Sequence, residues 1–276
     1  MKAIITRADD CASSHAANEA ILEAIETGFV KNVSVLACGG CLEEAAEMMA
    51  GKKEVCFGLH ACINSEWDRV VWGPVAPADQ VASLIDRRGV FYQDTRDFLL
   101  HRPVIEEILT EYRCQLERLR KMGFEIRYMD SHMFPELAVD GLQEAMSRMA
   151  EKEGLIDHAW FNRILPGNDR IAGGAGAFEK SLSEMNGQYL MVMHPAKYGE
   201  EMRLTGNAGA DGETVARARE RDYRFLTDEK NLRLCKSYGV KLLRYDEARR
   251  AGERYRLQPG DFQEKERRRN IWRCLK

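Results

Sequence analysis

The 276-residue chain has no apolar run close to the roughly 18 residues that a membrane-spanning helix needs. Prolines are few, at 7, and 45% of the residues are hydrophobic, which excludes a disordered or fibrous class. The net charge of −3 leaves no excess of basic residues for general nucleic-acid binding. The first residues form a strand-like pattern rather than a signal peptide, so we expect a cytoplasmic protein.

Two common motifs are also missing. No glycine-rich Walker motif is present, which argues against phosphoryl transfer. Eight cysteines occur at irregular spacings, and only Cys38 and Cys41 have the spacing of a redox or zinc motif. Because no second pair has this spacing, we interpret the cysteines as reduced thiols, most of them buried.

Short apolar segments alternate with longer stretches of helical periodicity. The expected strands are Lys2–Ala8, Asn32–Ala37, Val55–His60, Ile126–Asp130, His158–Asn162, Tyr189–His194 and Val240–Tyr245. The expected helices cover 14–28, 41–51, 102–122, 139–153 and 213–238, and irregular segments cover 61–101, 166–179 and 197–212. This alternation predicts an α/β fold with about seven parallel strands, an irregular (β/α) barrel similar to a TIM barrel. We expect one catalytic domain over 1–276, with a core over about 1–248 and a basic C-terminal tail over about 249–276.

Polar residues lie at or just after the carboxyl ends of four of the expected strands. They are Asp9, Asp10, His60, Asp130, His132 and His194. The carboxyl ends of parallel barrel strands meet on one face, where active sites form. Each residue has a structural alternative: a lone histidine often only fills a hydrogen-bonding role, and Asp10 can cap the helix that begins near Ser14. The prediction of a functional site fails only if all of these structural alternatives are true at the same time.

Two imidazoles and one carboxylate are a common donor set for divalent metal ions. We therefore predict one ion bound by Asp10, His60 and His132, with Zn²⁺ expected first and Mg²⁺, Co²⁺, Ni²⁺ or Mn²⁺ as alternatives. Asp9 is placed to act as a general base, and His194 as a general acid. This combination suits hydrolysis of an amide or an ester.

These residues resemble motifs of the YdjC-like carbohydrate deacetylases, the family that contains chitooligosaccharide deacetylase. The similar segments, in order, are Ala8-Asp9-Asp10 with Ser14 and Asn18, Gly58-Leu59-His60, Asp130-Ser131-His132 and His194-Pro195-Ala196. Trp72-Gly73-Pro74 and the stretch from Ser83 to Phe91 resemble the long loop of the family. The sequence departs from the family at Cys11-Ala12, where Phe-Gly is frequent, and at Met133-Phe134-Pro135, where further histidines are frequent.

The resemblance implies an irregular α/β barrel and the same three metal ligands. It implies removal of an N-acetyl group from an amino sugar or short chitooligosaccharide, with Asp9 as base and His194 as acid. Arg163 resembles a family arginine that orients the site, and Trp72 and Asp130 are further candidates for substrate binding. A small amino sugar is the expected partner, and the family makes a homodimer plausible.

Other functions stay open at this level. The same donors suit another metal-dependent reaction on a related barrel, such as amide or lactam hydrolysis or sugar isomerisation. A catalytically silent binding protein is a third possibility, although it predicts loss of Asp9 or His194. Trp67 and Trp72 can stack on a sugar or simply fill the core.

Overall fold

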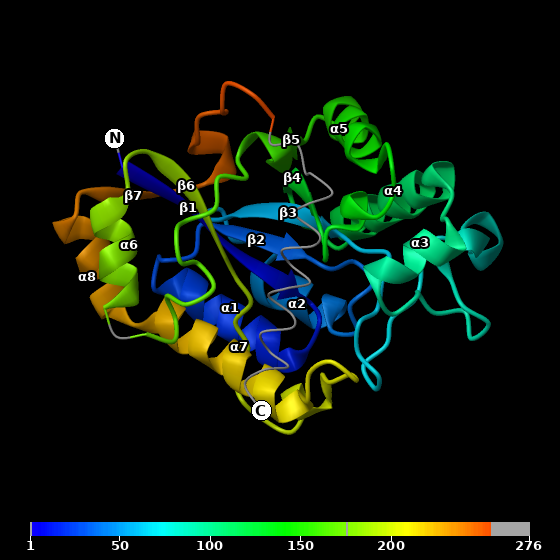
Figure 1. The fold of residues 1–276 in the computed structure, drawn as a ribbon, viewed down its shortest axis with the longest axis horizontal. Coiled ribbons are helices and arrows are strands. Elements are labelled where there is room, and N and C mark those ends of the chain that lie inside the picture. Colours follow the sequence, from blue (N-terminus) through cyan, green and yellow to red (C-terminus); the bar gives the residue numbers. More distant parts are fainter. Residues whose placement is uncertain (1, 175, 255–276) are drawn as a thin grey trace.

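The computed structural model describes residues 2–174 and 176–254, and these contain one seven-stranded sheet (Figure 1). The strands are β1 (Lys2–Cys11), β2 (Asn32–Val35), β3 (Cys56–Ala61), β4 (Ile126–Ser131), β5 (Ile156–Asp157), β6 (Gln188–Met193) and β7 (Val240–Leu243). Neighbours run in the order β5-β4-β3-β2-β1-β6, with β7 also paired to β1, and every pair of strands is parallel. This curved half-barrel confirms the predicted fold class.

Strand β1 pairs with three other strands, β2, β6 and β7, and is almost entirely buried. Its residues Ala3 to Ala8 pair with β6 along one edge. Along the other edge, the first half pairs with β7 and the second half with β2. The apolar side chains of β1 thus enter the core, while its carboxyl end lies beside the ends of β2 and β6.

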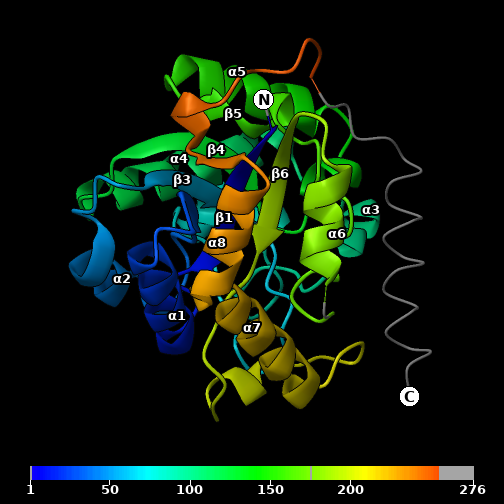
Figure 2. The ribbon, with the colours of Figure 1, turned by 90° about the vertical axis from the view of Figure 1, so that its left-hand side faces the viewer.

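The α-helices lie around the outside of the curved sheet (Figures 1 and 2). They are α1 (His15–Glu26), α2 (Leu42–Met49), α3 (Phe98–His101), α4 (Ile105–Lys121), α5 (Leu142–Lys152), α6 (Ala177–Glu184), α7 (Gly212–Thr227) and α8 (Glu229–Ser237). In α4, Ile108, Tyr112 and Leu116 recur at helical spacing and are buried, which explains why this amphipathic segment packs as a helix.

Two expected elements are wrong in detail. The segment His158–Asn162 is not a strand, because β5 ends at Asp157 and a 3-10 helix covers His158–Trp160. The Asp157 side chain accepts a hydrogen bond from the Ala159 backbone, 2.9 Å away, and so caps that turn.

The expected helix 213–238 is two helices, α7 and α8, because the first ends before Asp228 and the second begins after it. The Asp228 side chain accepts from the Lys230 backbone at 2.9 Å and begins α8. Helix α6 also begins inside the glycine-rich stretch 166–179 that was expected to be irregular.

Two long connections meet beside the carboxyl end of the sheet. The first runs from β3 to α4, and the second from β6 to α7. The Asn207 side chain donates to the Glu66 carbonyl at 2.8 Å, and the Asp68 amide donates to the Gly206 carbonyl at 2.9 Å. No helix among the described residues is long and apolar enough to cross a membrane. The predicted basic tail lies outside the described residues from position 255 onward.

Candidate metal centre

Asp10 lies at a sharp local bend near the end of β1. Its φ angle of 64° is in the left-handed region, which is uncommon for a residue other than glycine, and the pairing with β2 shifts register between Ala8 and Cys11. Asp10 is not the cap of α1, because Ser14 caps that helix by accepting from the Ala17 amide at 3.0 Å. The bend therefore leaves the Asp10 carboxylate available for another role.

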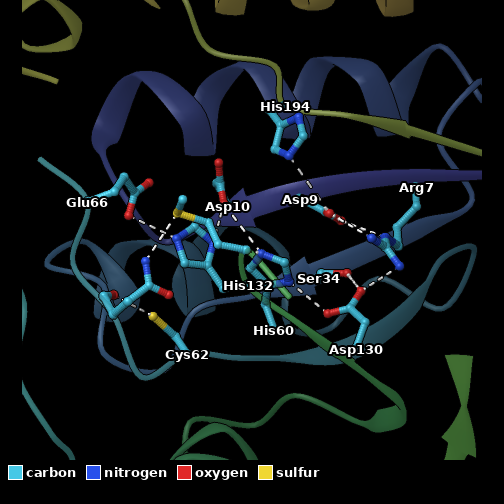
Figure 3. A network of polar contacts seen from close by, with 12 residues as sticks. Arg7, Asp9, Asp10, Ser34, His60, Cys62, Glu66, Asp130, His132 and His194 are labelled. Carbon is cyan, nitrogen blue, oxygen red and sulfur yellow. Dashed lines mark hydrogen bonds and ion pairs between the residues drawn. The ribbon is translucent and has the colours of Figure 1, made fainter. Parts of the chain in front are cut away.

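Asp10, His60 and His132 converge as the strand ends predicted (Figure 3). Asp10 Oδ1 lies 3.4 Å from His60 Nε2 and 3.4 Å from His132 Nδ1, and the two ring nitrogens are 3.1 Å apart. A point equidistant from these three atoms in their plane is about 1.9 Å from each, close to the roughly 2.0–2.2 Å of Zn–N and Zn–O bonds. The three donors thus fit one divalent ion.

Asp10 Oδ1 is buried and has no hydrogen-bond partner. Burial disfavours the charged carboxylate, but Arg219, His132 and His60 hold the pKa of Asp10 well below its usual range. An ionised oxygen without a partner is costly in a protein interior. A bound cation would supply that partner, which is a second reason to assign a metal centre here.

Each of the three donors is supported by a neighbour on its other polar atom. His60 Nδ1 lies 2.7 Å from Asp130 Oδ1, and His132 Nε2 lies 2.9 Å from Glu66 Oε2. Arg219 Nη2 lies 3.0 Å from Asp10 Oδ2. Burial opposes protonation of the histidines, but Asp130 and Asp9 raise the pKa of His60 to about 10. Carboxylates in these positions fix the ring orientation of metal-binding histidines.

Arg7 forms ion pairs with both Asp9 and Asp130 beside the centre (Figure 3). Its guanidinium contacts both oxygens of Asp9, at 2.7 and 2.8 Å, and Asp130 Oδ2 at 2.8 Å. The Ser34 hydroxyl also donates to Asp130 at 2.6 Å. Burial works against ionisation of Asp130, but Arg7 and His60 hold its pKa well below its usual range. Asp9 is therefore held in a fixed orientation beside the centre.

His194 follows β6 and lies above Asp9, with Nε2 4.0 Å from Asp9 Oδ2. Its side chain is 38% exposed, in contrast to the buried ligands. The His194 backbone amide donates to Asp222 Oδ2 at 3.0 Å, which ties this segment to α7. Burial raises the pKa of Asp222 to about 6.

A pocket opens beside the centre, between the two long connections. Its lining includes Asp10, Glu66, Trp67, Trp72, His194 and Arg219. Trp72 is only 6% exposed, and its indole donates to the Asn64 carbonyl at 2.7 Å. This tryptophan therefore fills the core and also forms part of the pocket wall, so the two alternatives for it are compatible.

Two predicted substrate contacts lie elsewhere. Asp130 is completely buried behind His60, so it supports a ligand rather than facing the pocket. Arg163 donates to Asn186 and to the Tyr189 hydroxyl near the start of β6, at the end of the sheet opposite the centre. Its predicted orienting role has no support from this position.

Sequence reasoning missed Arg7, Glu66, Arg219 and Asp222. Arg7 stands two positions before Asp9 on β1, so strand alternation places both side chains on the same face. That spacing was a usable signal. Glu66 lies in an irregular connection and Arg219 on the arginine-rich helix α7, where no periodic pattern distinguishes them from solvated charges.

The fold and this cluster define an α/β half-barrel with an Asp-His-His centre at the carboxyl ends of its strands. The model of the family described as YdjC-like protein matches residues 3–237. The chain belongs to the YdjC-like family.

Similar proteins of known description are distant. A carbohydrate deacetylase of Oceanobacillus iheyensis is 25% identical over 125 residues, which are 45% of this chain and 51% of that protein. A carbohydrate deacetylase of Enterococcus faecalis is 26% identical over 132 residues, 48% of each chain. The matched regions thus span about half the length of these relatives.

The fold is also found in a solved structure. A protein of Enterococcus faecalis V583, described as a candidate cellobiose-phosphate cleavage protein, superposes with a TM-score of 0.72 at 19% identity. The match covers 89% of this chain and 98% of that one. At this identity the likeness supports the fold alone.

Proposed function

We propose that this protein is a metal-dependent carbohydrate deacetylase that removes an N-acetyl group from an amino sugar or short chitooligosaccharide. The observation that carries the proposal is the convergence of Asp10 Oδ1, His60 Nε2 and His132 Nδ1 on a single point. Membership of the YdjC-like family and the two deacetylase relatives support the substrate class. Zn²⁺ is the ion expected first.

When bound, the divalent ion supplies Lewis acidity to the attacking water and to the acetyl carbonyl. Asp9 Oδ2 accepts the proton of the water, because Arg7 holds this carboxylate in a fixed orientation beside the centre. His194 Nε2, on the open side, donates a proton to the sugar nitrogen as the C–N bond breaks. The products are acetate and a free amine, and the proton accepted by Asp9 balances the one given by His194.

The pocket offers surfaces suited to a sugar. Trp67 and Trp72 contribute aromatic area, and Ser14 and Thr205 contribute hydroxyls. Aromatic side chains combine an apolar face with a polar group, a combination suited to carbohydrate. An amino sugar as partner and a homodimer as assembly are further parts of this proposal.

The test is acetate release from N-acetylglucosamine oligomers by protein loaded with Zn²⁺, Co²⁺, Ni²⁺ or Mg²⁺. Wild type is expected to release acetate. Asp9→Asn is expected to lose about 10²–10⁴-fold in turnover, which is typical for removal of a general base. Metal binding without acetate release would favour another metal-dependent reaction, and a protein that binds no metal would favour a binding function.

A further inference from the structure

The three donors of the metal centre differ in the charge that supports them. Both histidines are backed by carboxylates, Asp130 and Glu66, whereas the Asp10 carboxylate is backed by a cation. Carboxylates strengthen histidines as ligands, but a guanidinium withdraws electron density from a carboxylate. Arg219 is therefore the unusual member of the set.

Arg219 acts on only one oxygen of Asp10. Its Nη2 contacts Oδ2 at 3.0 Å, while Oδ1 faces His60 and His132 and has no hydrogen-bond partner. An aspartate can bind a metal through one oxygen or through both. Here the second oxygen is already engaged in a charge-assisted hydrogen bond.

The backbone of α7 fixes Arg219 in this place. The Arg219 carbonyl accepts from the Ala196 amide at 3.2 Å, and one turn later Asp222 accepts from the His194 amide. The side chain is 20% exposed and lines the pocket next to His194. The backbone of Arg219 is thus anchored to the same segment that carries the proposed acid, while its guanidinium reaches Asp10.

We propose that Arg219 is a positioning residue that makes Asp10 a one-oxygen ligand and so keeps a coordination position of the metal open. This inference rests on the metal centre of the proposed function. Three protein donor atoms leave room for water and substrate, whereas a two-oxygen Asp10 would occupy a further position.

The test uses Co²⁺, because its visible absorption weakens as its coordination number rises. Arg219→Gln is expected to bind Co²⁺ no more weakly than wild type but to lose absorption intensity, as the freed Oδ2 joins the ion. Arg219→Lys is expected to restore the wild-type spectrum, because an ammonium can still engage Oδ2. Arg217→Gln is the matched control, since Arg217 lies on the same helix, 60% exposed, and pairs with Glu213.

Equal spectra for wild type and Arg219→Gln would overturn the role of Arg219, as would loss of Co²⁺ binding by a folded variant. X-ray absorption of Co²⁺-loaded wild type is an independent measurement that needs no variant, and a two-oxygen carboxylate signature there would also overturn it. Neither readout uses a sugar, so failure of acetate release would contradict the proposed function without touching this inference.

Discussion

Two groups of residues surround the candidate site, and they are held in different ways. The strand-end cluster comprises Asp9, Asp10, His60, Asp130 and His132. The pocket wall comprises Glu66, Trp72, His194 and Arg219. The cluster is positioned at the ends of paired parallel strands, and each of its members is at most 9% exposed. The wall is held by single contacts between connections, such as Asn207 to Glu66 and Asp222 to His194.

The difference separates two kinds of function. Backbone ladders fix the cluster at the short distances that metal binding requires. The wall lies on irregular connections and on α7, where movement costs less and where side chains such as His194 reach solvent. We therefore expect changes at the ligands Asp10, His60 and His132 in the cluster to remove the metal, and changes in the wall to alter turnover or affinity while the metal stays bound.

The largest effect is expected from His60→Ala in the cluster. Loss of one of three donors should strip the metal and abolish activity, because the remaining two cannot hold it tightly. Metal content after dialysis, measured by mass spectrometry, checks this. His101→Ala is the control, since His101 is exposed and stacks on Tyr92 away from the centre. Full metal occupancy in His60→Ala would contradict the assignment of the centre.

In the wall, His194→Ala should keep its metal and lose about 10²–10⁴-fold in turnover, the usual range for a general acid. Metal content and steady-state kinetics on the same preparation measure the two effects separately. A His194→Ala protein without metal would remove the distinction between cluster and wall, because His194 would then belong with the ligands.

Glu66→Gln should give an intermediate result, with metal affinity weakened about tenfold, since partners of metal-binding histidines typically contribute 10- to 100-fold. Glutamine retains an acceptor for His132 but not the charge. Competition with a chelator measures the affinity. Glu54→Gln, at a residue with a 55% exposed side chain, should leave it unchanged. Unaltered affinity in Glu66→Gln would show that this contact only packs the wall.

The smallest effect concerns Asp222, whose pKa burial raises to about 6. The folded protein then holds this proton more tightly than the unfolded chain, so the contribution of Asp222 to stability is fully present below about pH 4 and is lost as the pH rises through 6. Asp222→Asn keeps an acceptor for the His194 backbone amide and stays neutral at every pH. Between pH 4 and pH 7, its free energy of unfolding should therefore fall by about 1–2 kcal/mol less than that of wild type.

Urea unfolding at several pH values checks this difference. Asp79→Asn, at an exposed residue, is the control and should follow wild type. If the free energy of unfolding changed with pH in the same way for wild type and Asp222→Asn, the Asp222 carboxyl would be ionised at no cost in the folded protein.

The same division explains what the sequence could predict. Asp10, His60 and His132 were predictable because parallel strands align their carboxyl ends, and a change in hydropathy marks where each strand stops. The seven-stranded α/β fold was predictable from the alternation of short apolar segments with longer stretches of helical periodicity. The wall residues Glu66 and Arg219 could not be predicted from the sequence, because their partners are distant in sequence and only tertiary packing brings them together.

The errors in the fold have a local cause. Asp157 and Asp228 both use their side chains to begin a new helix. In the first case β5 ends before the segment that was expected to form the strand, and in the second case one expected helix is divided into two. An aspartate within an apolar or helical pattern is compatible with continuation or with a cap, and the pattern alone does not separate the two. Arg163 contacts Tyr189 near the start of β6, and its orienting role, which only the family resemblance implied, stays a prediction.

Strand β1 carries both aspartates, yet the partner of its first half is β7, more than two hundred residues later in the chain. During synthesis on the ribosome, Lys2 to Ile5 must wait for residues 240–243 to emerge before that edge is covered. For most of translation the nascent chain thus presents an open, apolar strand edge, the kind of surface that invites pairing with other chains. Chaperone dependence should accordingly be greatest for chains stalled before β7.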